Sequence, residues 1–301
     1  VDGEKRDLIL MQVSRGPASM IDFPREMQYN QYCSSEHMIL TTSPAEQGMY
    51  ELLRISGNIL ESKSQPISVT GTALGACFVS RNKFVTLEDH DTLFIRNADN
   101  IVTKRIVIPV GGCSRLFSGG RSGRVLLLSG DELMVLDVDS SRILGSCVVN
   151  GVKRCLWNSD GSRVAVISKQ LLMVLTSDLK TISVVNERLR VKDCVWDSRG
   201  ILLYTTLSQL KYLLPSGAVG VVRSLREPVY LCSVRGMSVL VFSRAGKCIS
   251  LRINVTEYSL KYYLETHQYK EAIHLIRTTH VDCQALLGYL QQNGYQDIAL
   301  H

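Results

Sequence analysis

The run Glu-Asp-His-Asp at positions 88–91 holds residue types that could do acid–base chemistry or bind a metal ion. It lies between two apolar stretches that read as neighbouring strands of a hairpin. Tight turns favour the same polar residues, because their side chains bond to nearby backbone groups. Since comparable residues do not recur at a fixed spacing along the chain, the run predicts a β-turn rather than a catalytic centre.

The glycine-rich run Gly-Gly-Arg-Ser-Gly at 119–123 could cradle a phosphate. A phosphate-binding loop of that kind continues into Gly-Lys-Ser or Gly-Lys-Thr and then a helix, whereas a strand-like stretch follows here. Three histidines near the C-terminus, His267, His274 and His280, lack the spacing of metal ligands. The sequence therefore predicts turns and surface residues at these places, and no enzyme, cofactor or metal site.

The cysteines suggest a reducing environment. The chain has nine, an odd number, and no two form a Cys-x-x-Cys pair, which disfavours a disulfide framework and a zinc ribbon. Cys77, Cys155 and Cys194 fall at matching places in successive apolar runs, where a small buried thiol packs well. Reduced thiols, the lack of a long apolar run and the lack of a secretory leader together predict a cytoplasmic protein.

The net charge is +6 at pH 7, and the Lys and Arg residues are scattered, often singly within turns. Nucleic-acid binding asks for clustered cations interleaved with aromatic residues. The pattern therefore predicts a solvated surface and no nucleic-acid partner. Weak attraction to an anionic membrane surface or to an acidic partner is the second interpretation.

The elements that must position these residues are visible in a sequence repeat. The run Val-Lys-Arg-Cys-Leu-Trp-Asn-Ser-Asp-Gly at 152–161 matches Val-Lys-Asp-Cys-Val-Trp-Asp-Ser-Arg-Gly at 191–200, with six identical positions and an offset of 39. A β-propeller blade takes roughly 40 to 45 residues. Because one such unit cannot bury its apolar faces alone, neighbouring units must stack on each other.

Apolar pairs along the rest of the chain keep a similar period of 37 to 45 residues. The pairs begin at Ile39, Phe84, Val125, Val164, Leu202 and Val239. One interval reads as four short strands, 153–157, 163–167, 171–175 and 180–185. The inner strands alternate weakly, as expected where both faces of a sheet are covered. We expect a mainly β fold, a WD40-like β-propeller of six blades, with seven allowed if the N-terminal region holds another unit.

The last blade lacks a strand by this count, because only the runs 230–234, 239–242 and 248–253 are visible there. The apolar run 7–13 has strand character and no unit of its own. We expect it to close the last blade as its outer strand, which removes two open sheet edges; the alternative is a disordered leader. The propeller domain is accordingly predicted over 1–255.

Two tryptophans end the repeated strands. Trp196 followed by Asp197 resembles the WD dipeptide, but it precedes the turn after a first strand and is not the signature of a third strand. We expect Trp157 and Trp196 to pack between blades, with a ligand-facing role as the alternative. Cys155 and Cys194 are assigned to the same packing.

From residue 256 the apolar residues recur at steps of three and four, which is typical of helices. Breaks at 266–268, 278–282 and 292–294 divide the segment into three short helices. Helices of this length are weak alone in water, so 256–301 is predicted to start an α-helical solenoid that continues in the same polypeptide. The residues expected to pack it are Tyr262, Tyr269, Ile273, Ile276, Leu286, Tyr289 and Leu290.

Several motifs resemble a known family, the coatomer alpha subunits, at the second propeller and the opening of the solenoid. The motifs are the run at 191–200, Tyr-Thr-Thr at 204–206, Pro-Val-Tyr at 228–230, Tyr-Lys-Glu at 269–271 and Tyr-Leu-Gln-Gln-Asn-Gly-Tyr at 289–295. The likeness covers most of the chain and is strongest from residue 76. Gln296, where the family commonly has a proline, and a short connection at 56–68 depart from the family pattern, which suggests a divergent member.

The resemblance implies a structural, non-catalytic part of the coat protein I complex, acting as a protein–protein scaffold in Golgi-to-ER and intra-Golgi transport. Its implied partners are other coatomer subunits, foremost the beta-prime subunit, and its implied location is peripheral, on Golgi membranes and transport vesicles. The family's site for dilysine signals is attributed to the first propeller, so no cargo-binding residue is carried over. The alternatives are a beta-prime subunit, an intraflagellar transport protein, a nucleic-acid-binding propeller or an enzyme.

Overall fold

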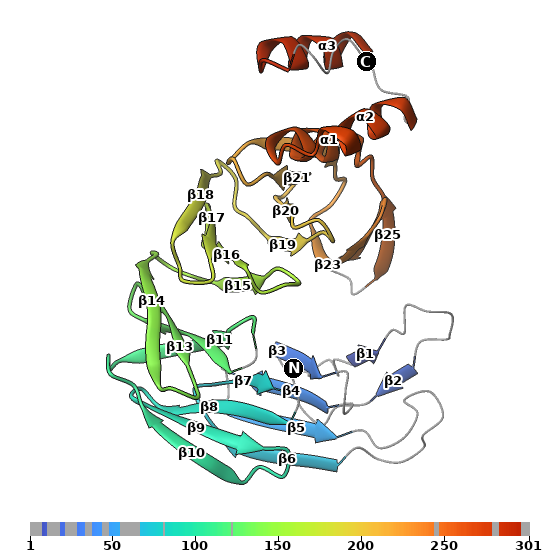
Figure 1. Cartoon of the computed structure of the whole chain (residues 1–301). Helices are drawn as coiled ribbons and strands as arrows, with labels where there is room; N and C mark the ends of the chain where they lie inside the picture. Colours follow the sequence, from blue (N-terminus) through green and yellow to red (C-terminus); the bar gives the residue numbers. More distant parts are fainter. Residues whose placement is uncertain are drawn as a thin grey trace. The chain divides into compact units, whose positions relative to one another are not determined.

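The computed structural model describes a chain of strands followed by three helices (Figure 1). The described residues are 8–10, 19–21, 29–33, 38–43, 48–54, 67–80, 82–121, 123–243, 247–278 and 283–295, with side chains described from residue 48 onward except at 54, 67 and 283–287. Contacts between Cα atoms divide the chain into two compact units, Val1–Asn150 and Gly151–His301.

Unit 1 contains, among its described residues, three four-stranded antiparallel sheets and one pair of strands. The sheets follow the chain as β3–β6, β7–β10 and β11–β14, and β1 pairs with β2. The strands are β1 (Leu8–Leu10), β2 (Ser19–Ile21), β3 (Tyr29–Cys33), β4 (Met38–Ser43), β5 (Met49–Arg54), β6 (Ile67–Thr72), β7 (Gly75–Ser80), β8 (Lys83–Asp89), β9 (Thr92–Asn97), β10 (Val102–Val107), β11 (Cys113–Ser118), β12 (Arg124–Ser129), β13 (Glu132–Asp137) and β14 (Arg142–Val148).

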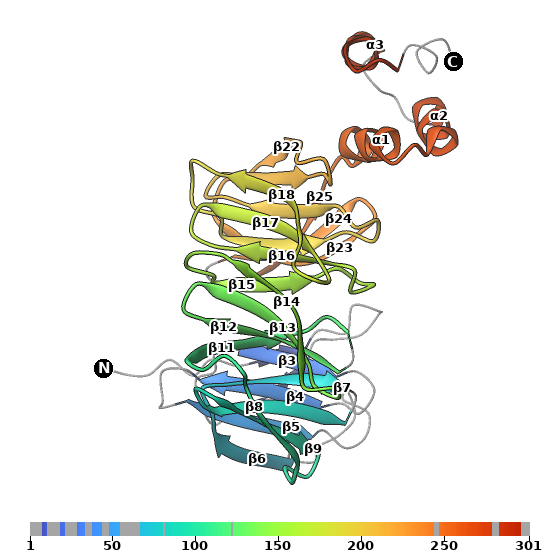
Figure 2. The ribbon, with the colours of Figure 1, turned by 60° about the vertical axis from the view of Figure 1, so that its left-hand side comes forward.

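Unit 2 continues with sheets β15–β18 and β19–β22, a three-stranded sheet β23–β25, and helices α1 to α3. Figure 2 shows α1 and α2 beside each other. The elements are β15 (Arg154–Trp157), β16 (Arg163–Ile167), β17 (Leu171–Thr176), β18 (Thr181–Asn186), β19 (Asp193–Trp196), β20 (Leu202–Thr205), β21 (Gln209–Leu213), β22 (Val219–Ser224), β23 (Val229–Arg235), β24 (Ser238–Ser243), β25 (Cys248–Arg252), α1 (Thr256–Glu265), α2 (Tyr269–Thr278) and α3 (Cys283–Gln292).

These elements confirm the predicted meanders and the three predicted helices to within a few residues. The sheet β23–β25 has three strands among the described residues, as counted from the sequence. The run 7–13 contributes β1, which pairs with β2, while residues 7 and 11–13 lie outside the described part of the chain. Its expected role in closing the last blade therefore stays a prediction. None of the described helices is long and apolar enough to span a bilayer.

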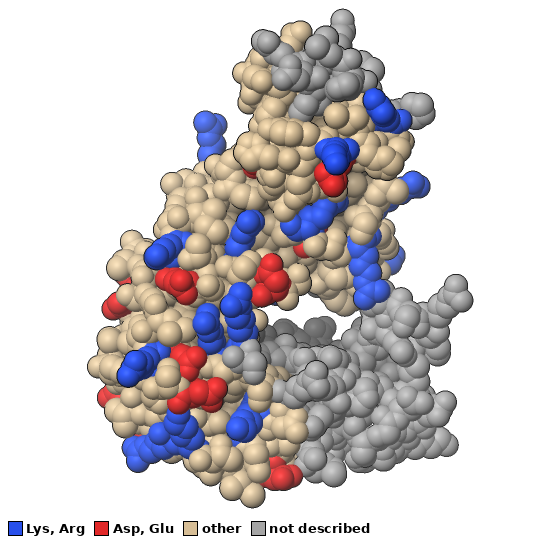
Figure 3. Space-filling view, in the orientation of Figure 1, with Lys and Arg blue, Asp and Glu red and all other residues tan. Residues whose placement is uncertain are grey.

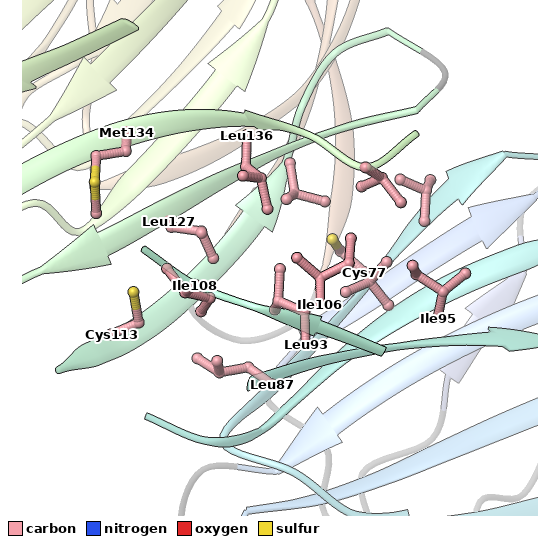
Figure 4. Packing of buried hydrophobic residues seen from close by; sticks show 14 residues of the cluster. Cys77, Leu87, Leu93, Ile95, Ile106, Ile108, Cys113, Leu127, Met134 and Leu136 are labelled. Atoms are coloured by element: carbon pink, nitrogen blue, oxygen red, sulfur yellow. The ribbon is translucent and has the colours of Figure 1, made fainter. Parts of the chain in front are cut away.

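Inner strands such as β12, β13, β16 and β17 are buried on both faces, which explains their weak alternation. Val125 to Leu128 of β12 are all buried, whereas the outer strand β14 alternates between exposed and half-buried residues. In unit 1 a core forms between sheets β7–β10 and β11–β14, where Leu87 and Leu127 are fully buried (Figure 4). Burying a Leu or Val side chain contributes about 1.5–3 kcal/mol. A sheet gains this stabilisation only when a neighbouring sheet covers its apolar face.

A tyrosine of a third strand lies over a glycine of a fourth strand in two sheets. Tyr50 of β5 is paired with Gly71 of β6, and Tyr212 of β21 is paired with Gly220 of β22. A Cβ atom at either glycine would overlap the tyrosine ring. Both rings are buried, at 2% and 1% exposure. Glycine at these positions therefore provides the space that the ring fills.

Replacing Gly220 by alanine should lower the free energy of unfolding by about 1–3 kcal/mol, because the added methyl group overpacks a buried ring. Urea unfolding followed by circular dichroism measures it. The matched control is Gly288→Ala in α3, where an added Cβ meets nothing within 4 Å and should be neutral or stabilising by up to about 1 kcal/mol. Equal effects of the two substitutions would contradict the packing argument.

Candidate functional site

A network of polar side chains in unit 2 joins neighbouring sheets to one another and to helix α1. Its central member is Asp193, the first residue of β19, which is 3% exposed. One carboxylate oxygen, Oδ1, forms an ion pair with Arg154 of β15 and accepts a hydrogen bond from the Cys194 N–H at 2.9 Å. The other, Oδ2, accepts from the Leu231 N–H of β23 at 3.0 Å. One carboxylate thus links three consecutive sheets.

The electrostatics of Asp193 reflect two opposing effects. Burial raises the pKa of its carboxyl, and the Arg154 charge together with the N–H groups of Cys194 and Leu231 opposes that rise. A buried carboxylate is costly unless charge and hydrogen bonds compensate it. Here the three donors come from three sheets, so the compensation exists only while those sheets stay adjacent.

The residues predicted to pack between blades lie beside this network. Trp196 donates its Nε1–H to the Leu156 carbonyl of the preceding sheet at 2.9 Å. Cys194 is 1% exposed within a hydrophobic cluster, and burial raises the pKa of its thiol. Trp157 and Cys155 are half-buried. Their assignment to packing between blades stays a prediction.

A second link joins the loop after β18 to the next sheet. Glu187 of that loop accepts a hydrogen bond from the Tyr204 hydroxyl of β20 at 2.5 Å. Its two oxygens also accept from Lys211 Nζ of β21 at 2.9 and 3.0 Å. Tyr204 is fully buried, and burial followed by the adjacent Glu187 carboxylate raises the pKa of its phenol. The tyrosine therefore remains a hydrogen-bond donor to Glu187.

The turn after β19 reaches helix α1. Asp197 is 4% exposed and holds the turn by accepting from the backbone N–H groups of Arg199 and Ile201, both at 2.9 Å. Arg199 then extends to α1, where it donates to the Ser259 hydroxyl and lies 5.7 Å from the centre of the Tyr258 ring. The turn after β19, which belongs to the sequence repeat, thus also attaches α1 to the sheet.

Lys261 of α1 joins the helices to the sheet β19–β22. Its Nζ donates to Glu257 at 2.7 Å and to the Tyr212 hydroxyl at 3.0 Å, and Tyr212 also donates to Glu257 at 3.1 Å. The same Nζ lies 5.1 Å from the centre of the Tyr289 ring of α3. Burial opposes the Lys261 charge, but its bonds to Glu257 and Tyr212 outweigh burial and raise its pKa to about 12.

The three helices share a small hydrophobic cluster. Its buried members are Leu260, Leu264, Ala272 and Leu290. Of the residues predicted to pack the solenoid, Ile273, Ile276 and Tyr289 lie half-buried against this cluster, Leu290 is part of it, and Tyr262 packs against the cluster of the last sheets.

Two other residues that were predicted to pack the solenoid, Tyr269 and Leu286, are not among the described residues of this cluster. Tyr269 is 40% exposed and its hydroxyl contacts His267 Nδ1 at 2.8 Å. Leu286 belongs to α3, and its side chain lies outside the described residues.

The residues that first suggested chemistry have structural roles in unit 1. Glu88 pairs with Arg96, while His90 and Asp91 form the turn between β8 and β9. His90 Nδ1 lies 2.9 Å from the Cys113 carbonyl oxygen, and Asp91 accepts from the Gly112 N–H at 2.8 Å. The turn is thereby joined to the start of the next sheet, which confirms the predicted β-turn.

The glycine-rich run 119–123 connects β11 to β12, as predicted for a hairpin, with Ser122 outside the described part. Gly120 and Gly123 have φ of 73° and 80°, which glycine adopts without strain. Among the described residues, no group of three His, Cys, Asp or Glu side chains could hold a metal ion.

Sequence reasoning missed the residues that differ between the two repeats. Arg154 and Asp193 occupy the same repeat position with opposite charges, 39 residues apart, and pair with each other. Asp160 and Arg199 occupy another shared position, yet only Arg199 is described as contacting a helix. Opposite charges at equivalent positions of neighbouring repeats were the signal that could have identified the first pair.

Comparison with known proteins is consistent with this geometry. A family model described as COPA/B second beta-propeller matches residues 2–278. A protein of Schizosaccharomyces pombe that carries a coatomer alpha-subunit name is 35% identical over 92% of this chain. Coatomer subunit alpha-1 of Arabidopsis thaliana is 31% identical over 99% of it, and coatomer subunit alpha of Dictyostelium discoideum 30% over 97%. The chain spans 22%, 24% and 23% of these relatives' own length.

Solved structures of low sequence identity share the fold. The β-propeller domain of Cps50 (Swd1) from Myceliophteria thermophila aligns with a TM-score of 0.59 at 12% identity, covering 80% of this chain and 86% of that one. KlHsv2 with its loop 6CD replaced by a Gly-Ser linker aligns at 0.55 and 14% identity, covering 78% and 82%. The predicted mainly β, WD40-like propeller fold is confirmed.

Replacing Asp193 by alanine should lower the free energy of unfolding by about 2–4 kcal/mol, because the buried Leu231 and Cys194 N–H groups lose their acceptor. Thermal or urea unfolding measures the loss. Asp178→Ala provides the control: Asp178 is exposed, and its described side-chain bond is one to Ser177 at 3.4 Å. It should change stability by less than about 0.5 kcal/mol. Similar losses in both variants would contradict the role given to Asp193.

Replacing Lys261 by methionine keeps the apolar stem and removes the charge. We expect a loss of about 1 kcal/mol and faster amide hydrogen exchange across Thr256–Glu265, because the bonds to Glu257 and Tyr212 disappear. Hydrogen exchange with mass spectrometry measures it. Lys270→Met, at an exposed position of α2, should leave exchange in α1 unchanged. Unaltered protection of α1 in Lys261→Met would contradict the attachment of α1 to the sheet through Lys261.

Proposed function

We propose that this chain, which belongs to the COPA/B second beta-propeller family, is a structural element of a coatomer coat. In this proposal it acts as a rigid protein–protein scaffold in Golgi-to-ER and intra-Golgi transport and catalyses no reaction. The curated relatives reported above carry coatomer alpha-subunit names, and this chain corresponds to less than a quarter of their length. What a whole coatomer subunit does is therefore attributed to this chain only as a proposal.

The attachment of α1 to the sheets is the observation that carries the scaffold role. Arg199 reaches the helix from one turn, and Lys261 and Glu257 bind the Tyr212 hydroxyl of β21. Tyr258 is 1% exposed within the cluster of the last sheets. Because hydrogen bonds and apolar burial both resist rotation of α1, this helix leaves the sheets of unit 2 in a defined direction, which a coat element needs.

The organisation we propose divides the chain by function. The strands through residue 255 form the propeller, with 7–13 as the strand that closes the last blade, and 256–301 begins a solenoid. In this arrangement Trp157, Trp196, Cys155 and Cys194 pack between blades. The helix cluster around Leu264 and Leu290 starts the packing that further helices would continue.

The proposed partners are other coatomer subunits, foremost the beta-prime subunit, together with the rest of the same polypeptide's solenoid. The proposed location is the cytoplasm, peripheral on Golgi membranes and transport vesicles through the coat. A beta-prime subunit or an intraflagellar transport protein would share the same architecture. The alpha-subunit names of the reported relatives favour the alpha assignment over both.

Immobilised chain should capture purified beta-prime subunit or other purified coatomer subunits in a pull-down, with an unrelated β-propeller of similar size as the control. Fluorescent fusions of the full-length protein should colocalise with a Golgi marker and disperse when coat recruitment is blocked. The proposal would be contradicted if the chain bound none of the purified coatomer subunits. Localisation to cilia would instead support the intraflagellar alternative.

A further inference from the structure

The outer edges of the sheets carry backbone groups that no other strand satisfies. Each four-stranded sheet ends in an outer strand whose second edge pairs with no other described strand, which leaves some of its N–H and C=O groups without ladder partners. Charge does not single out a surface in the same way. Over the face shown in Figure 3, the Lys and Arg side chains of the described residues are spread out, and several have Asp or Glu beside them.

The outer strand β22 presents a regular edge. The Leu214 N–H donates to the Ala218 carbonyl at 2.9 Å, so these residues form a hydrogen-bonded pair at the start of the β21–β22 ladder. Hydrogen-bonded and non-hydrogen-bonded pairs alternate along an antiparallel ladder. Val219 and Val221 therefore belong to non-hydrogen-bonded pairs, and their N–H and C=O groups point outward, away from β21.

The outward groups of these two residues are unpaired within the described part of the chain. β22 pairs there with β21 alone, and no other described backbone group bonds to Val219 or Val221. Their side chains are open as well, with Val219 38% and Val221 45% exposed. A strand edge that combines unpaired backbone groups with exposed apolar side chains is a template for an added strand.

The other outer strands of four-stranded sheets lack this combination. The same alternation places Arg105 at an outward position of β10, Ser146 at one of β14 and Thr70 at one of β6. In β18 a register shift follows Thr181 and interrupts the outward positions. A charge or a bulge at an edge opposes strand addition, and a hydroxyl offers little apolar contact. β22 instead has two consecutive outward positions that are both valine.

The neighbours of the valines narrow the chemistry of a partner. Lys211, which lies opposite Val221 in the ladder, already binds both carboxylate oxygens of Glu187, at 2.9 and 3.0 Å. Arg223, which follows the valines along β22, donates to the Arg252 carbonyl at 3.0 Å. Because these two charges are engaged, the contacts that the edge offers are backbone hydrogen bonds and apolar side-chain packing.

The length of this edge favours an extended segment over a second folded copy of the chain. The regular part ends at the register shift that follows Val221, so it covers residues 219–221. A stable interface between folded proteins buries about 1,200–2,000 Å², which so short an edge does not provide. A flexible segment needs only to extend along the edge, and it binds reversibly.

We propose that the edge of β22 at residues 219–221 docks an extended segment of a partner protein that carries β-branched apolar residues and adds a strand to the sheet β19–β22. The outward N–H and C=O groups of Val219 and Val221 pair with the backbone of the segment, and its apolar side chains cover the two valines. The inference goes beyond the coat assignment and does not depend on it.

The test is the binding of the full chain to a fluorescein-labelled peptide of alternating Thr and Val flanked by lysines, measured by fluorescence anisotropy. Bound peptide should also slow amide hydrogen exchange across Val219–Ser224, because outward N–H groups become bonded. Val221→Lys should weaken binding by about tenfold or more, since a charge at an edge opposes strand addition. The matched control, Val184→Lys, alters a valine of β18 that is 47% exposed and should bind like the unmodified chain.

A second peptide, with N-methyl groups on the amides that face the edge, cannot donate to the outward carbonyls and should not bind. This comparison uses the unmodified chain, so it decides the matter even if thermal unfolding shows that Val221→Lys does not fold. The proposal is overturned if the first peptide does not bind, if both peptides bind equally well, or if both valine variants lose the same affinity. It is equally overturned if the chain alone forms dimers that Val221→Lys dissociates while the peptide does not bind.

Discussion

The buried carboxylate of Asp193 is the constraint on which unit 2 depends. It accepts hydrogen bonds from the Arg154 guanidinium and from the N–H groups of Cys194 and Leu231, and these three residues belong to three different sheets. Apolar contacts between sheets are tolerant of small shifts, whereas a buried anion that loses a donor is strongly destabilised. The hydrophobic clusters therefore supply most of the stabilisation, and the carboxylate selects the relative placement of neighbouring sheets.

Divergence between repeats creates the connections that identical repeats could not. Equivalent positions carry Arg154 and Asp193, so two copies of one strand form a complementary pair. The turn that follows carries Arg199 in the second copy, and this side chain binds Ser259 of α1. Had both copies kept the same residue, like charges would face each other at the first position. The differences between the two repeats thus give the sheet β19–β22 specific contacts with the preceding sheet and with α1.

Much of the fold could be predicted because its signals are short-range. Arg163–Ile167 was predicted as a strand and found as one, and the helix break at 266–268 separates α1 from α2. The side chains of the network could not be predicted, because Arg199 and Ser259 are 60 residues apart and meet only through the fold.

The three-sheet carboxylate also bears on the order in which the chain can be assembled on the ribosome. Arg154 emerges before Asp193, and Leu231 emerges after it, so the anion meets one donor early and another only when β23 has been made. Until then Oδ2 of Asp193 lacks the Leu231 N–H donor, and water must solvate this oxygen. The carboxylate of Asp193 therefore gains its full set of donors only after β23 has been synthesised.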